Sequence, residues 1–223
     1  MTKNLRKLYS AALAMLVTLL LPVAVLAAGK EIIILHTNDI HCGISDNLGI
    51  DKVSQYKKNL KKEGYPVALV DAGDAIQGAP IGTLSNGESI VKIMNAVGFD
   101  FAIPGNHEFD YGMERFLKLA SRQKCGYYSC NFVDVKTRKP VLKPYKILNL
   151  GGKKIGFVGV TTPETLVTST PKYFQDKDGK FIYGFCEDQT GEKVYSAVQR
   201  AVLLSGRIGN RCRLPARYAR SSR

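Results

Sequence analysis

Three short polar segments carry side chains of the types that bind divalent metal ions. Each follows a short apolar run, and together they contain Asp39, His41, Asp71, Asp74, Asn106, His107, Glu108 and Asp110. Carboxylate, amide and imidazole donors suit divalent ions such as Mn, Zn, Fe or Mg, whereas copper(I) and iron–sulfur clusters require thiolates. One Asp-x-His pair is commonly only a hydrogen-bonding pair. Three such segments at the ends of successive strands predict a metal site.

The segments around these side chains alternate between strand-like and helix-like patterns. Short apolar runs predict strands, and apolar spacing of three and four residues predicts amphipathic helices. The expected strands are 31–36, 67–70 and 101–103, and the expected helices are 52–60, 89–97 and 113–120. Strand, polar loop and helix, repeated three times, predict an α/β fold with parallel pairing. The polar loops should then meet at one edge of the sheet.

The pattern changes in the second half of the sequence. Strands are expected at 127–133, 145–150 and 154–160, with a tight hairpin at Gly151 and Gly152. The polar segment 165–188 predicts a long loop, and 192–204 predicts a helix. The length predicts one domain of ordinary size.

Three sequence motifs resemble signature blocks of the calcineurin-like metallophosphoesterases, specifically the 5'-nucleotidase and UDP-sugar hydrolase branch. They are LHTNDIHCG at 35–43, DAGD at 71–74 and GNHEFD at 105–110. They occur in the family's order, and the similarity extends from about residue 31 to about residue 199. The resemblance implies a metallophosphoesterase α/β sandwich, incomplete at its C-terminus. It also implies two divalent metal ions, such as Mn, Zn or Mg.

The resemblance assigns roles to individual residues. Asp39 and His41 are expected to bind the first ion, Asp74 to bridge both ions, and Asn106 to bind the second. His107 and Asp110 match the family's catalytic pair. A histidine backed by an aspartate can stabilise charge on a phosphoryl group or protonate the leaving oxygen.

Four other residues near these motifs have structural interpretations. Asp71 and Glu108 are expected to support the site without binding an ion. His36 is expected to be buried near the metals with its hydrogen bonds satisfied. Cys42 stands where the family usually has glycine, and we do not expect it to be a ligand.

The last part of the sequence departs from the family. The family completes its metal site with later histidine blocks, whereas this chain has three histidines and none after His107. Up to residue 199 the basic residues are 21 Lys and four Arg, but 200–223 holds seven Arg, no Lys and no acid, which supplies +7 of the net +13. A frameshift near residue 200 explains both observations. We expect 28–199 to be the N-terminal part of the metallophosphoesterase domain and 200–223 an aberrant basic tail.

The first 27 residues have the pattern of a secretory signal peptide. Lys3, Arg6 and Lys7 precede an uncharged apolar run that ends in small residues. An uncleaved membrane anchor is the alternative. We expect an exported protein, located in the periplasm, at the cell wall or outside the cell, with no stable membrane insertion after cleavage.

The chain has five cysteines, an odd number, so at least one is unpaired or pairs between molecules. A disulfide between Cys125 and Cys130 is one alternative, and two buried free thiols are favoured.

The sequence supports one main function and two alternatives. The main one is a two-metal hydrolase that acts on extracellular nucleotides or other phosphoesters, inactive or nearly so as this truncated chain. A 2',3'-cyclic-nucleotide phosphodiesterase, a UDP-sugar hydrolase and a thiosulfate-oxidation hydrolase are alternative activities within the same fold. The second function is a non-catalytic fragment with a partial metal site. The third, nucleic-acid binding through 200–223, is disfavoured because Tyr218 is the only aromatic residue there and export removes such partners.

Overall fold

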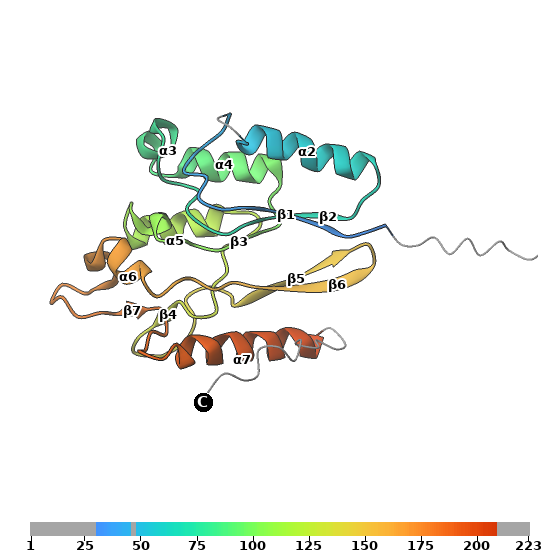
Figure 1. Ribbon diagram of the computed structural model, residues 1–223. Helices are drawn as coiled ribbons and strands as arrows, with labels where there is room; N and C mark the ends of the chain where they lie inside the picture. The colour runs from blue at the N-terminus through green and yellow to red at the C-terminus, as the bar shows by residue number, and fades with distance from the viewer. Residues whose placement is uncertain (1–29, 46–47, 209–223) are drawn as a thin grey trace, which may run out of the picture. The chain divides into compact units, whose positions relative to one another are not determined.

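A computed structural model describes residues 30–45 and 48–208 (Figure 1). The expected signal peptide and residues 209–223 of the expected tail lie outside the described residues. The chain separates into Met1–Glu31 and Ile32–Arg223, and all the helices and strands given below belong to the second unit.

A parallel sheet of three short strands holds the three polar loops. Its order is β1 (Ile33–Thr37), β2 (Val67–Asp71) and β3 (Phe101–Ala102). Ile33 pairs with Val67, and Val70 pairs with Phe101. The parallel pairing confirms the prediction, and the carboxyl ends of all three strands lie at one edge.

Helices connect the strands as the apolar spacing predicts. They are α2 (Ile50–Lys62), α4 (Glu88–Val97) and α5 (Met113–Arg122), and Gly98 ends α4 in the left-handed conformation. A further short helix, α3 (Pro80–Ser85), was not predicted because its six residues are too few to show a period. Figure 1 shows α2, α3 and α4 on one side of the sheet.

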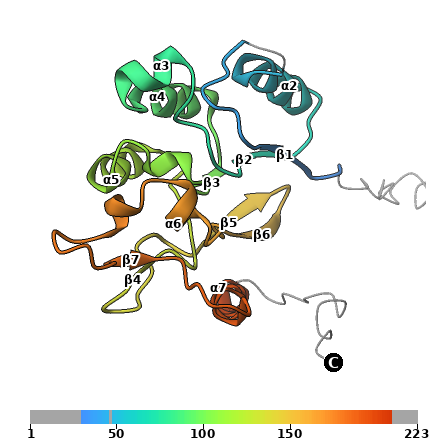
Figure 2. The ribbon, with the colours of Figure 1, turned by 60° about the vertical axis from the view of Figure 1, so that its left-hand side comes forward.

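The second half begins with the expected hairpin, formed by β5 (Tyr145–Leu150) and β6 (Lys153–Val158). Helix α7 (Glu192–Ile208) packs against both strands, and Figure 2 shows the hairpin between the parallel sheet and this helix. The helix continues beyond residue 204, so the first part of the expected tail is helical, and Ala201 and Ser205 are buried. None of the helices in 30–45 and 48–208 has the length and apolar character needed to cross a membrane.

Two expectations for the second half were only partly correct. In segment 127–133, Tyr127 and Tyr128 form isolated β-bridges with Ala102 and Lys143, but the segment reaches a named strand only at Val133, the first residue of β4 (Val133–Asp134). Side-chain hydrogen bonds also hold the buried residues in between. Asn131, for example, donates to the carbonyl oxygens of Thr161 at 2.6 Å and Phe185 at 3.0 Å. Segment 165–188 is ordered rather than one long loop. It holds α6 (Thr165–Thr168), the 3-10 helix η2 (Pro171–Phe174) and β7 (Tyr183–Gly184), which pairs with β4.

A cluster of phenylalanines supports the last of the three polar loops. Phe109, Phe116, Phe132, Phe174 and Phe185 are fully buried. The ring of Phe109 lies at the centre, 4.6 Å from Phe116 and 5.0 Å from Phe174 between centroids. Segment 165–188 is therefore anchored in the core by two aromatic rings, although its polar composition predicted a loop.

Replacing Phe109 with alanine is expected to lower the free energy of unfolding by about 3–5 kcal/mol, because a large cavity forms among the aromatic rings. Denaturant unfolding measures the change. Phe181→Ala is the matched control, since Phe181 is 40% exposed and its truncation should cost about 0.5 kcal/mol or less. Equal losses for the two variants would contradict the central position of Phe109.

Candidate metal centre

Backbone hydrogen bonds hold the first two polar loops side by side at the edge of the sheet. The N–H of Asp39 donates to the Gly73 carbonyl at 3.1 Å, and the N–H of His41 donates to the Asp74 carbonyl at 3.0 Å. Residues 33 and 34 positions apart in the sequence are thus brought into contact. The prediction that the loops meet is confirmed.

His41, Asp74 and His107 form a half-buried cluster at this edge. Their possible ligand atoms all lie within 4.8 Å of one another. The two imidazole rings meet edge to face, with centroids 4.8 Å apart. Two imidazoles and a carboxylate fit a divalent ion of the Zn or Mn type.

Hydrogen bonds orient the ligands of this cluster. The Nδ1 atom of His41 lies 3.1 Å from the carbonyl oxygen of Gln77, which leaves Nε2 available to an ion. The backbone N–H of His107 donates to Oδ1 of Asp74 at 2.8 Å. Burial raises the pKa of Asp74, and a hydrogen bond with Asp39 adds to the rise.

Asp39 and Asn106 lie beside this cluster. Oδ1 of Asp39 is 3.8 Å from Nε2 of His41, and its other oxygen accepts a hydrogen bond from Asn38. Asn106 donates through Nδ2 to the carbonyl oxygen of Thr168, in α6, at 3.4 Å. Their roles as ligands stay predictions.

His107 and Asp110 form the pair that the sequence predicted. Nδ1 of His107 lies 2.6 Å from Oδ2 of Asp110, and Ser169 donates to the other Asp110 oxygen at 3.3 Å. Burial alone would lower the pKa of His107, but the hydrogen bond and charge of Asp110 outweigh it, so the pKa is raised. The catalytic role of the pair stays a prediction, because His107 also belongs to the three-residue cluster.

Glu108 is a positioning residue whose contacts the sequence did not reveal. It is fully buried, and one carboxylate oxygen accepts the N–H groups of Asp74 at 2.8 Å and Gly105 at 2.7 Å. The other accepts the N–H groups of Ala75 at 2.8 Å and Ile76 at 3.4 Å. Burial raises the pKa of Glu108, whereas these hydrogen bonds act in the opposite direction. One side chain therefore links the second and third loops.

Asp71 is buried below the loops and accepts hydrogen bonds from the Thr37 hydroxyl at 2.6 Å and the Gly73 N–H at 3.1 Å. Burial raises the pKa of Asp71 to about 8. These contacts match the supporting role expected from the sequence.

Two glycines allow the second and third loops to approach closely. A Cβ atom on Gly105 would lie 2.3 Å from Oδ1 of Asp74, and one on Gly73 would lie 2.6 Å from the nitrogen of Gly105. Gly73 also has φ +108, which disfavours any side chain.

Three of the expected metal ligands have a strained backbone. Asp39, His41 and Asp74 have φ values of 52°, 42° and 59°, a region that residues other than glycine rarely adopt. Such strain is concentrated at functional sites. No local sequence signal predicted it.

The expectation for His36 was wrong. Successive residues of β1 point to opposite faces of the sheet, and His36 is exposed on the same face as Ile34, whereas Thr37 is buried. Cys42 is buried, and burial raises its pKa. Cys125 and Cys130 are both buried and free, as favoured from the sequence.

Comparisons with known proteins identify similar sequences and folds. A family profile described as calcineurin-like phosphoesterase matches residues 32–197. The 5'-nucleotidase of Rattus norvegicus is 34% identical over 174 residues, which cover 68% of this chain and 30% of that protein. The 2',3'-cyclic-nucleotide 2'-phosphodiesterase/3'-nucleotidase of Yersinia enterocolitica is 30% identical over 168 residues, covering 63% of this chain and 26% of that protein.

A solved structure agrees with the sequence comparisons. The NAD nucleotidase of Haemophilus influenzae superposes with a TM-score of 0.62 and 28% identity, over 79% of this chain and 32% of that one. The chain thus spans about a third or less of the length of these relatives.

Proposed function

The chain belongs to the calcineurin-like phosphoesterase family, whose members are metal-dependent hydrolases, and we propose that it carries the metal centre of a phosphohydrolase of the 5'-nucleotidase type. The proposed substrates are nucleotides, and the products are phosphate and a nucleoside. The convergence of His41, Asp74 and His107 supports this proposal. We also propose export, from the pattern of the first 27 residues.

The donor set can be divided between ions in two ways. In a two-ion arrangement, Asp39 and His41 would hold the first ion, Asn106 would contribute to the second, and Asp74 would contribute to both. In a one-ion arrangement, His41, Asp74 and His107 would hold a single ion, as their mutual distances allow. When bound, a divalent ion supplies positive charge that stabilises the phosphoryl group during transfer.

His107 is proposed to act on the substrate in the two-ion arrangement. Its Nδ1 is held by Asp110, so Nε2 is directed elsewhere and is available to a phosphoryl oxygen or to the leaving oxygen. The short contact with Asp110 also favours the positively charged imidazolium. This contact fixes the orientation of the ring before substrate binds.

Two alternatives remain alongside this proposal. The similarity to the Yersinia enterocolitica protein favours a cyclic-nucleotide phosphodiesterase as the second candidate. The third candidate is a non-catalytic polypeptide with a partial metal site. It is favoured because the described residues offer one group of three possible ligands, His41, Asp74 and His107, and for the same reason we expect slow turnover.

The purified chain is expected to release phosphate slowly from 5'-AMP when Mn²⁺ or Zn²⁺ is added, and not in the presence of a chelator. His107→Asn should lower kcat by about 100-fold, a usual loss when an acid–base or electrostatic group is removed. His36→Asn is the control, because His36 is exposed on β1, and it should keep the parent rate. The second candidate would be favoured if the chain left 5'-AMP intact but opened a 2',3'-cyclic nucleotide to a nucleoside monophosphate and then released phosphate from that product. No turnover with any divalent ion would contradict the enzyme and favour the third.

A further inference from the structure

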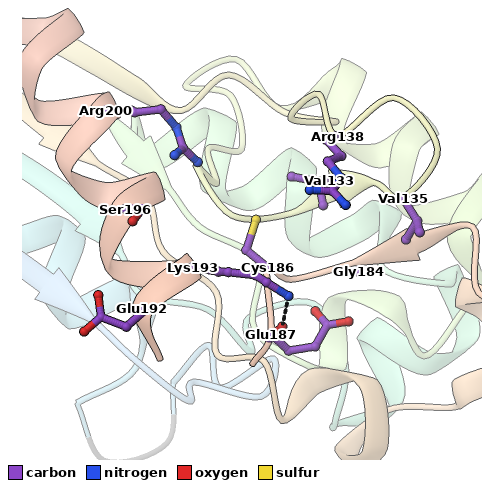
Figure 3. Close-up of a pocket in the computed structure, with 10 residues that line it drawn as sticks. All are labelled: Val133, Val135, Arg138, Gly184, Cys186, Glu187, Glu192, Lys193, Ser196 and Arg200. Atoms are coloured by element: carbon purple, nitrogen blue, oxygen red, sulfur yellow. Dashed lines mark hydrogen bonds between the residues drawn. The ribbon is translucent and has the colours of Figure 1, made fainter. Parts of the chain in front are cut away.

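A cavity of about 650 Å³ lies between the β4–β7 pair and one face of α7 (Figure 3). None of its lining residues comes from the loops of the metal centre. Three basic side chains line it from two sides: Arg138 from the turn after β4, and Lys193 and Arg200 from α7. We call this space the basic cavity, defined by these three residues together with Cys186. Its volume lies in the usual range for small-molecule sites.

The two arginines of the basic cavity have no carboxylate partner. Within 30–45 and 48–208, neither Arg138 nor Arg200 takes part in an ion pair. Figure 3 shows both guanidinium groups directed toward the space around the Cys186 thiol. Burial raises the pKa of Cys186, so the thiol is neutral and does not balance their charge.

The two acidic residues that line the cavity do not neutralise the arginines. The carboxylate of Glu187 accepts the Phe185 N–H at 2.6 Å, which holds it in its own loop. Its carbonyl oxygen, in turn, accepts a hydrogen bond from the Lys193 amine at 3.3 Å. The carboxylate of Glu192 points away from the arginines in Figure 3. The unbalanced charge of the cavity is therefore positive.

Residues that line the basic cavity have left-handed backbone conformations, as do residues of the metal centre. Seven residues other than glycine have left-handed φ values in the part of the chain that the structure describes. Asn86 caps α3, and four belong to the metal-centre loops: Asp39, His41, Cys42 and Asp74. The other two are Arg138, at 55°, and Cys186, at 56°, and both line the basic cavity. Such φ values persist where the surrounding structure holds them, so the fold fixes the backbone of Arg138 and Cys186 at the cavity.

We propose that the basic cavity binds a small organic phosphate, with the phosphate group between Arg138 and Arg200. A phosphate monoester carries about −1.5 to −2 charges at neutral pH, which matches two unpaired guanidinium groups. Guanidinium donors also fit phosphate oxygens in a bidentate geometry. The side chains of Val133 and Val135 line the same space and offer an apolar surface to the organic part. This second site is independent of hydrolysis at the metal centre.

The test is a titration of the chelator-treated chain with phenyl phosphate, followed by amide NMR. Chelation keeps phosphate from binding through metal ions at the first site. We expect the largest shifts at the amides of Gly184, Cys186 and Lys193, and none at Asp39 or His107. Inorganic phosphate should bind more weakly, because it lacks the part that contacts the valines. Absence of binding, shifts confined to the metal-centre loops, or equal affinities for the two ligands would overturn the proposal.

Variants provide the second arm of the test. Arg138→Asn combined with Arg200→Gln should weaken phenyl phosphate binding by about tenfold or more, since two charge-assisted contacts are lost. Asparagine is chosen at 138 because it tolerates the left-handed backbone. Lys177→Gln, which alters an exposed lysine outside the cavity, should leave the affinity unchanged. If the double variant fails to fold, Arg200→Gln alone is measured, and a loss equal to that of the lysine control would overturn the proposal.

Discussion

Asp74→Asn is expected to lower the affinity of the chain for Mn²⁺ by about 100-fold or more and to remove metal-dependent hydrolysis. Asparagine keeps an oxygen that can accept the His107 N–H, and it tolerates the φ of 59° at this position. The substitution therefore removes the carboxylate charge while leaving the loop geometry intact. Equilibrium dialysis or electron paramagnetic resonance of Mn²⁺ measures the affinity without reference to activity.

Asp178→Asn is the matched control for this prediction. Asp178 is an exposed acid in the segment between η2 and β7, outside the metal cluster. The control also removes one carboxylate charge from the chain. A difference in Mn²⁺ affinity between the two variants therefore reflects the position of the lost carboxylate. Unchanged Mn²⁺ affinity in Asp74→Asn would show that the cluster of His41, Asp74 and His107 is not the ion's site.

Glu108→Gln is expected to lower the free energy of unfolding by about 3 kcal/mol, because the amide nitrogen of glutamine would face backbone N–H groups in a buried site. Glutamate accepts four such N–H groups with its two oxygens, and glutamine can offer only one oxygen to them. Denaturant unfolding of the metal-free chain measures the loss. Mn²⁺ affinity should fall as well, since the loops of Asp74 and Gly105 are no longer held together.

Glu114→Gln provides the comparison for Glu108. Glu114 is exposed on α5, and its replacement should change stability by about 0.5 kcal/mol or less. A purely structural role for Glu108 predicts a stability loss with unchanged Mn²⁺ affinity in the fraction that remains folded. A positioning role predicts that both quantities fall, and Glu108→Asp should recover neither, because the shorter side chain cannot span the two loops.

The order of elements could be predicted from the sequence because it depends on local patterns. Apolar spacing located α2, α4 and α5, and the two glycines at 151 and 152 located the β5–β6 hairpin. Prediction failed where aromatic anchors are widely spaced. Phe174 and Phe185 hold segment 165–188 in the core, but two rings in a polar segment produce no detectable period.

The sequence by itself determined the chemical types at the metal centre and the loops that carry them. Carboxylates and imidazoles after three strands indicate a divalent ion, because donor preference is a property of side-chain type. Only the tertiary structure decided which of those side chains meet. His107 joins His41 and Asp74, Glu108 links two loops through their backbone, and His36 is exposed on β1. These outcomes depend on contacts between residues far apart in the chain and on strand direction, neither of which a local pattern contains.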